Sequence, residues 1–183
     1  NFVDIKRFSK KPIDAFRQVI APKGEKIMVH ASNFRKVKRV NDVIKIFAEV
    51  RKELPAKLLM IGDGPERSAT EELAKELGVH DDVRFVGKQE QIEEILLVSD
   101  VFVLPSEYES FGLAALEAMA ARVPVISTNT GGLPEINIHG ETGYTANLGD
   151  ISAMSKYAVD MLSNETLLAE LKEGAYQQAL RFD

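Results

Sequence analysis

The chain has 183 residues, of which 45% are hydrophobic and 28% are charged, and its formal net charge is −5. This length suits one domain with its own hydrophobic core, or at most two small ones. The negative charge argues against a nucleic-acid partner, and the absence of cysteine excludes disulfides, thiolate nucleophiles and cysteine metal sites.

Short runs rich in Val, Ile and Phe alternate along the chain with segments of helical period. The runs are almost continuously apolar, as expected for a parallel sheet that helices cover on both faces. This alternation predicts βαβ units and hence one α/β domain with a doubly wound, Rossmann-like parallel sheet, spanning residues 1–183. The predicted strands are residues 26–31, 56–62, 83–87, 101–105, 123–128 and 142–146, and the predicted helices are residues 40–53, 65–77, 89–98, 111–121, 150–162 and 164–180.

Ligands of such sheets bind beyond the carboxyl ends of the strands, where the strand order reverses. The loop after the first strand, residues 32–39, carries the cations Arg35, Lys36, Lys38 and Arg39. Such a cluster suits a phosphate or pyrophosphate, because arginine supplies a planar fork and lysine a point charge. A solvated loop leading into the next helix is an equally good interpretation of the same residues.

Two further loops contain pairs of glycines. Gly62 and Gly64 in "GDGP" suggest a dinucleotide fingerprint, but Arg67 stands where the third glycine is needed, so close backbone approach in a tight turn is the better interpretation. Gly131 and Gly132 in "NTGGLPE" allow unusual backbone angles. That loop either closes over a ligand or is a plain connection.

The stretch "SEYESFGLAALEAMA", residues 106–120, combines a turn with a helix. Ser110 is a good N-cap candidate, which would leave the amides of Phe111, Gly112 and Leu113 free to bind an anion. Glycine in the first turn allows a ligand to approach the backbone closely.

Two carboxylates flank this predicted anion site. Glu109 precedes the helix, and Glu117 lies about two turns, or roughly 10 Å, inside it. Carboxylates accept hydrogen bonds from vicinal hydroxyls, so one can hold a ribose and the other a hexose. A solvated helix glutamate is the plain alternative for Glu117, but the alanine-rich run predicts a buried helix, and a buried glutamate needs a partner.

Other kinds of catalytic centre find little support in the sequence. His30, His80 and His139 have no sequence-local partners for a triad or a metal site, and each is expected to be structural or exposed. No Asp-x-Asp pair occurs, so no metal site is assigned. No apolar run approaches the roughly 20 residues that span a bilayer, and no signal-peptide pattern opens the chain, so a cytoplasmic location is expected.

The sequence resembles the C-terminal half of the family 4 retaining glycosyltransferases of the GT-B fold. The E-x7-E motif from Glu109 to Glu117 carries the resemblance, and "GDGP", "VRFVG", "SDVFVLPSEYES", "VPVISTNTGGLPE" and "HGETGY" follow the family order over residues 26–150. Within the family, "SNFRKVKRV", "IGDGP" and "VGKQ" are most similar to the bacillithiol-pathway enzymes that join GlcNAc from UDP-GlcNAc to L-malate.

The resemblance implies a role for each motif residue. Glu109 would bind hydroxyls of the donor hexose, Glu117 those of the ribose, and Lys38 would be the phosphate lysine. Many members carry an arginine at the position of Asn33, so Arg35 is expected to replace it. The expected catalytic residues are Glu109, Arg35 and Lys38, and the expected donor-binding residues are Glu117, Ser110, Phe111, Gly112, Leu113, Gly62, Asn33 and Arg84. Arg84 and the neighbouring backbone of "VRFVG" would lie against the uracil.

The resemblance also implies what accompanies this domain. A UDP-sugar is the expected donor and needs no metal, and the small-molecule acceptor would be bound mainly by an N-terminal domain of a longer protein. Whether that longer protein is a homo-oligomer is left open by the resemblance. The isolated domain would then be inactive alone. Arg122 stands where close relatives usually have glycine, and we expect it to disturb the preceding helix end.

Three alternatives remain open at this point. E-x7-E does not read the base, so a transferase using GDP-mannose or ADP-glucose fits the same motif. A sugar-nucleotide epimerase shares the fold but should lack this motif context. A non-catalytic nucleotide-binding module would need only the binding residues.

Overall fold

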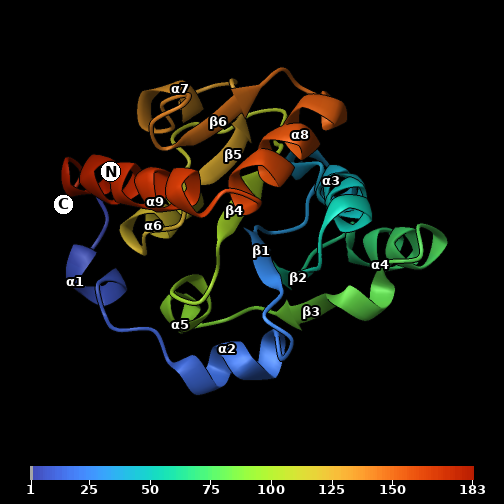
Figure 1. Cartoon of the computed structure of the whole chain (residues 1–183). Helices are drawn as coiled ribbons and strands as arrows, with labels where there is room; N and C mark the ends of the chain where they lie inside the picture. The colour runs from blue at the N-terminus through green and yellow to red at the C-terminus, as the bar shows by residue number, and fades with distance from the viewer. Residues whose placement is uncertain (1) are drawn as a thin grey trace.

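The computed structural model describes residues 2–183. Its centre is a six-stranded sheet in the order β3-β2-β1-β4-β5-β6, in which each strand is parallel to its neighbours (Figure 1). The predicted doubly wound α/β fold is therefore confirmed. The strands are β1 (Lys26–Ala31), β2 (Ala56–Ile61), β3 (Val83–Gly87), β4 (Val101–Leu104), β5 (Val125–Thr128) and β6 (Gly143–Ala146).

Helices cover both faces of the sheet and form a hydrophobic cluster with each face (Figure 1). In β1, Ile27 and Val29 belong to one cluster and Met28 to the other, which is why the strand must be apolar at successive positions. One face packs against α1 (Ile5–Phe8), α2 (Asp14–Ile20), α5 (Ile92–Leu96), α6 (Leu113–Ala120) and α7 (Leu133–Ile136), the other against α3 (Val40–Glu53), α4 (Arg67–Glu76) and α8 (Ile151–Leu162), and α9 (Glu165–Leu180) contributes to both.

Some helices and strands begin or end at residues other than those predicted. The predicted strand 123–128 begins only at Val125, because the amide of Val123 donates to Ala118 of α6 at 2.9 Å and Pro124 has no amide to give to the sheet. The short helices α1 and α2 were not predicted. No helix within residues 2–183 is long and apolar enough to cross a membrane.

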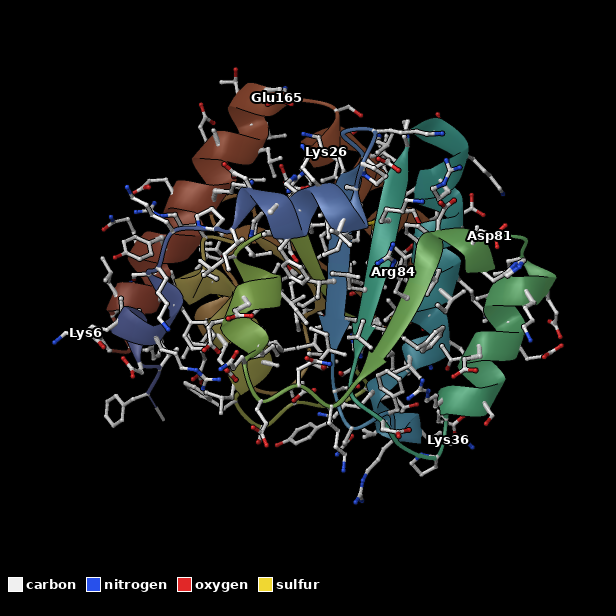
Figure 2. The ribbon with its side chains drawn as sticks, turned by 90° about the horizontal axis from the view of Figure 1, so that it is seen from below. Lys6, Lys26, Lys36, Asp81, Arg84 and Glu165 are labelled. Carbon is white, nitrogen blue, oxygen red and sulfur yellow. The ribbon has the colours of Figure 1, made fainter. Side chains whose placement is uncertain are left out.

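The strand order reverses at β1, which has β2 on one side and β4 on the other. Met28 is in register with Leu58 of β2 and with Val101 of β4. The loops that follow β1 and β4 therefore leave the sheet on the two sides of the switch point. Figure 2 shows Lys36, from the first of these loops, at the carboxyl ends of the strands, and Lys26 at the opposite end.

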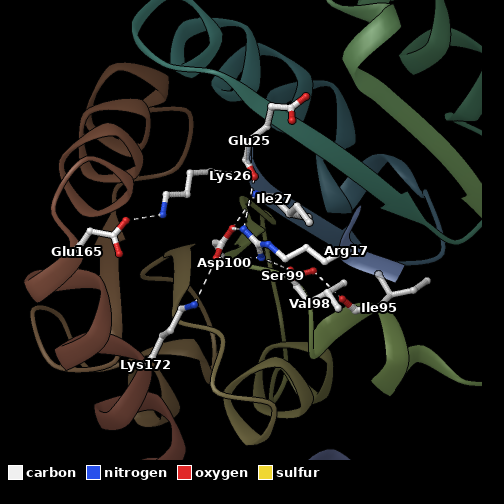
Figure 3. Close-up of polar contacts among 10 residues, drawn as sticks. All are labelled: Arg17, Glu25, Lys26, Ile27, Ile95, Val98, Ser99, Asp100, Glu165 and Lys172. Atoms are coloured by element: carbon white, nitrogen blue, oxygen red, sulfur yellow. Dashed lines mark hydrogen bonds and ion pairs between the residues drawn. The ribbon is translucent and has the colours of Figure 1, made fainter. Parts of the chain in front are cut away.

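At the amino end of the sheet, the buried carboxylate of Asp100 lies directly before β4 (Figure 3). It accepts hydrogen bonds from Arg17 of α2 at 2.9 Å, from the amide of Ile27 at 2.8 Å and from Lys172 of α9 at 3.2 Å. Burial acts to raise the pKa of Asp100, but these donors outweigh it and hold the pKa below its usual value. Asp100 thus joins two helices and two strands.

Candidate functional site

The loop after β1 is anchored by a buried aromatic ring. Phe34 is fully buried although its φ of 48° lies in the left-handed region, and its ring meets Phe85 edge-on, with 6.5 Å between centroids. Its carbonyl accepts a hydrogen bond from the amide of Glu66 at 2.9 Å. This anchor fixes the one-turn 3-10 helix that follows, Lys36–Lys38.

Lys38 and Glu109 meet across the switch point. The lysine Nζ lies 2.6 Å from Oε1 of Glu109, and the hydroxyl of Ser106 donates to the same oxygen at 3.0 Å. The side chains of Lys38 and Glu109 are only 20% and 13% exposed, so solvent screens this pair less than a surface pair. The structure therefore brings together two of the three predicted catalytic residues, and Ser106, which the sequence analysis did not select, supports them.

The other cations of this loop have different environments. Arg39 forms an ion pair with Asp42 at 2.7 Å and approaches Glu107 of the β4 loop at 3.7 Å, so it contributes to holding the two loops together. Arg35, Lys36 and the predicted donor-binding residue Asn33 are exposed at the same end of the sheet.

The glycines of "GDGP" are explained by close packing of backbone on backbone. A β-carbon at Gly62, where φ is 123°, would lie 1.8 Å from the carbonyl oxygen of Ser32, and one at Gly64 would lie 1.9 Å from that of Asn33. The predicted close approach is therefore confirmed, and its partner is the loop after β1.

The loop after β5 is likewise packed against the loop that carries Glu109. A β-carbon at Gly131 would lie 2.0 Å from the carbonyl oxygen of Glu109, and one at Gly132 would lie 2.4 Å from that of Ser110. The amide of Gly132 also donates to the backbone carbonyl of Glu109 at 2.8 Å. This loop is thus a structural support for the backbone of Glu109.

The predicted N-cap of α6 is wrong. The helix begins at Leu113, and its N-cap is Gly112 with a φ of 86°, a conformation that favours glycine. A β-carbon there would lie 2.7 Å from the terminal methyl of Leu133, so packing of α7 also favours glycine. The exposed Ser110 remains in the loop, Phe111 packs edge-on against Phe182, and the amides of the first turn are those of Leu113, Ala114 and Ala115.

Glu117 is half-buried on α6, and within residues 2–183 no hydrogen bond or ion pair engages its carboxylate. Burial raises the pKa of Glu117, the positive charge of Arg7 acts against that rise, and Glu93 adds to it. Arg7 itself is held by Glu93 at 2.9 Å and by the carbonyl of Glu90 at 2.9 Å. No local pattern pointed to Arg7, because it lies about a hundred residues away from the motif that it faces.

Arg84 lies apart from the other predicted site residues, such as Lys38 and Glu109. It is the second residue of β3, toward the amino end of the strand, and its guanidinium donates to the carbonyl of Val19 in α2 at 3.3 Å. Figure 2 shows Arg84 and Lys36 well separated along the strand direction. Gly87, rather than Arg84, is the residue of this strand that lies at the carboxyl end.

His30 lies in β1 directly before the cationic loop and is fully buried. Its Nδ1 donates to the Val103 carbonyl at 2.8 Å, and its Nε2 accepts from the Ser32 hydroxyl at 2.8 Å. Burial, assisted by the charge of Lys38 and opposed by the Val103 hydrogen bond, lowers the pKa of His30 from 6.5 to about 4. The predicted structural role of His30 is confirmed, and His80 and His139 are exposed.

The free energy of unfolding is therefore expected to fall by about 2 kcal/mol between pH 7.5 and pH 5. The pKa of His30 is lower in the folded state than in the unfolded state. The contribution of neutral His30 to stability is therefore complete above about pH 6.5 and is lost as pH falls toward 4. Urea unfolding across this range measures the loss, and His30→Gln, which keeps a donor and an acceptor, should remove most of it. An unchanged pH dependence in the variant would contradict this assignment.

Residues 13–178 match the family described as "Glycosyl transferases group 1". The chain belongs to this glycosyltransferase family. Its sheet order is accordingly that of the sugar-nucleotide donor-binding domain, the C-terminal domain of the GT-B fold.

Among curated relatives, this glycosyltransferase domain is 43% identical to the N-acetyl-alpha-D-glucosaminyl L-malate synthase of Bacillus anthracis, over 97% of the chain and 48% of that protein. It is 36% identical to the 2-deoxystreptamine N-acetyl-D-glucosaminyltransferase of Niallia circulans, over 69% of the chain and 34% of that protein. The chain spans about half the length of the first of these relatives and less of the second.

Solved structures show the same fold. Sucrose-phosphate synthase from Thermosynechococcus elongatus superimposes with a TM-score of 0.88 at 28% identity, over 99% of the chain and 47% of that protein. The C-terminal domain of the group 1 glycosyl transferase LpcC from Francisella tularensis gives a TM-score of 0.83 at 24% identity, over 98% of the chain and 97% of that domain.

Proposed function

We propose that this chain is the donor domain of a two-domain retaining glycosyltransferase that transfers GlcNAc from UDP-GlcNAc to L-malate. The observation that carries the proposal is the pairing of Lys38 with Glu109 across the switch point. Beside it, the carboxylate of Glu117 on the adjacent helix has no hydrogen bond or ion pair with any residue of the described part of the chain, 2–183. The choice of donor and acceptor is supported by the 43% identity to a relative named as an N-acetyl-alpha-D-glucosaminyl L-malate synthase.

In this proposal each group of the site has a separate task. Glu117 accepts hydrogen bonds from the ribose hydroxyls, and Glu109 accepts them from the hexose, with its charge balanced by Lys38. Lys38 and the exposed Arg35 face the diphosphate, together with the free amides of the first turn of α6. Asn33, Ser110 and Gly62 are assigned to the surrounding loop backbone, and Gly87 replaces Arg84 as the residue of β3 nearest to the base.

The reaction breaks the bond between the sugar anomeric carbon and the UDP phosphate oxygen, and forms a bond to the acceptor hydroxyl oxygen. Negative charge grows on the leaving diphosphate, and Lys38, Arg35 and the helix amides stabilise it. The acceptor attacks from the leaving-group face, and its proton passes to a phosphate oxygen. Glu109 is held by Lys38 and Ser106 and serves as a hydroxyl acceptor rather than as a nucleophile, unlike a carboxylate of the retaining hydrolases.

The alternatives differ in what they predict for the longer protein. A transferase with a different donor would make a glycoside from GDP-mannose or ADP-glucose. An epimerase would change the sugar of UDP-GlcNAc without an acceptor, and a binding module would do neither.

Product analysis with the longer protein tests these possibilities directly. The protein is incubated with each nucleotide sugar, with and without L-malate, and the product is examined by mass spectrometry and NMR. The expected result is an α-linked GlcNAc–malate that forms only when UDP-GlcNAc and L-malate are both present. Turnover of UDP-GlcNAc to an epimer, or transfer from another donor only, would refute the proposal.

A further inference from the structure

A second group of cations lies at the amino end of the sheet, away from the Lys38–Glu109 pair. There a pocket of about 390 Å³ opens between the segment joining α1 to α2, the C-terminal ends of α5 and α6, and α9. Lys10, Lys11, Arg122 and Lys172 all line it, and none of its lining residues is acidic. This concentration of positive charge occurs in a chain whose net charge is −5.

Arg122 is held at this pocket by an unusual backbone conformation. Its φ is 62°, in the left-handed region where glycine is favoured, yet its amide donates to Met119 at 3.0 Å, and the cap of α6 is complete. The expectation that Arg122 disturbs the helix end is therefore wrong. The guanidinium lies 3.9 Å from the ring centroid of Tyr176 and pairs with the exposed Glu173, so it is oriented by α9.

The C-terminal carbonyls of the helices beside the pocket do not neutralise the positive charge of its lysines and arginine. C-terminal carbonyls normally attract positive charge, but here protein donors already engage several of them. The Ser99 hydroxyl donates to Ile95 at 2.8 Å, and Arg17 donates to Val98 at 2.6 Å. Beneath the pocket, the single carboxylate of Asp100 is shared by Arg17 and Lys172 (Figure 3). Glu173 balances Arg122 alone, so the charges of Lys10 and Lys11 remain in excess.

The remaining walls of the pocket are apolar or aromatic. Phe8, Leu97, Ala120 and the ring of Tyr176 line it together with the cations. Lys10 and Lys11 are exposed and project from a short segment, while Arg122 supplies a planar fork of donors. An arginine fork, flexible lysines and an apolar wall match a small molecule that carries a phosphate on an organic body.

We propose that this pocket binds a small organic phosphate, at a site separate from the donor site. The phosphate lies between Arg122, Lys10 and Lys11, and the organic part contacts Phe8 and Tyr176. The two sites are at opposite ends of α6, because Leu113 begins the helix beside Glu109, and Ala120 ends it at the pocket wall.

Phenyl phosphate is a suitable probe, and its binding can be followed by amide NMR. The chain itself serves for this titration because it has two hydrophobic clusters of its own. Perturbed amides are expected in residues 9–11 and 120–122, since Pro12 has no amide proton. Arg122→Gly suits the left-handed backbone and should weaken binding at least about tenfold while the protein stays folded. Lys36→Gln, which removes an exposed cation at the other end of the sheet, should leave the affinity unchanged.

Three results would overturn the proposal. Perturbations confined to the loops around residues 32–39 and 106–115 would place phenyl phosphate in the donor site instead. If folded Arg122→Gly bound phenyl phosphate as tightly as the wild type, the Arg122 guanidinium would not be part of the site. Binding to phosphatidic acid vesicles, with no binding of soluble phenyl phosphate, would assign these cations to a lipid surface.

Discussion

Replacing Lys38 with methionine is expected to lower kcat for sugar transfer by the longer protein about a hundred- to a thousandfold, the usual loss on removing one preorganised charge-stabilising donor. Lys38 lies 2.6 Å from Glu109 at the switch point and is mostly buried, so its charge acts in a less screened environment than that of a surface lysine. Methionine keeps an unbranched side chain of similar reach without the charge. Initial rates at saturating donor and acceptor measure the effect.

The neighbouring Lys36 provides the matched control. It belongs to the same one-turn helix, but its side chain is exposed. Lys36→Met should therefore change kcat less than about threefold, equivalent to roughly 0.7 kcal/mol of barrier. Full kcat in Lys38→Met would show that the transition state does not use this charge.

Asp100→Ala is expected to lower the free energy of unfolding by about 3–5 kcal/mol, because removal of one member of a buried ion pair leaves its partners uncompensated. Arg17 and Lys172 would both lose their shared carboxylate, and the amide of Ile27 would lose its acceptor (Figure 3). The side chain of Asp100 is only 4% exposed, so water replaces these contacts poorly. Urea unfolding of both proteins at pH 7 measures the difference.

A second ion pair in the same region serves as the control. Lys26 and Glu165 are joined at 3.0 Å, but the glutamate side chain is 87% exposed (Figure 3). Glu165→Ala should shift the unfolding free energy by less than about 1 kcal/mol, as is usual for surface pairs. Similar losses from the two substitutions would mean that burial does not set the strength of the Asp100 cluster.

The parts of the fold that the sequence predicted well are those with strong local patterns. Each strand is a short apolar run, and residues such as Ile27 and Met28 contribute to opposite faces, so the pattern could be recognised without knowledge of the partners. The alanine-rich run after Glu109 likewise predicted a buried helix that contains Glu117, and most residues of α6 are buried.

The errors occurred where distant residues determine local structure. Ser110 has good capping chemistry, but the helix begins at Leu113 because Gly112 takes a left-handed conformation and packs against Leu133 of α7. Arg84 has the charge expected of a ligand-binding residue, but its distance along β3 from the carboxyl end decides its environment. Such constraints come from tertiary packing and have no signature in a single segment.

Titration of this chain with nucleotides tests the central claim most directly. Thermal unfolding is followed with UDP, GDP, ADP or NAD, with and without Mg²⁺, in the wild type, in Glu117→Ala and in the exposed control Glu94→Ala. UDP at a hundred times its dissociation constant should stabilise the wild type and the control by about 2.7 kcal/mol regardless of Mg²⁺, and Glu117→Ala much less. Stabilisation by GDP or ADP but not by UDP, or equal stabilisation of Glu117→Ala by UDP, would contradict the assignment of this site to a uridine donor.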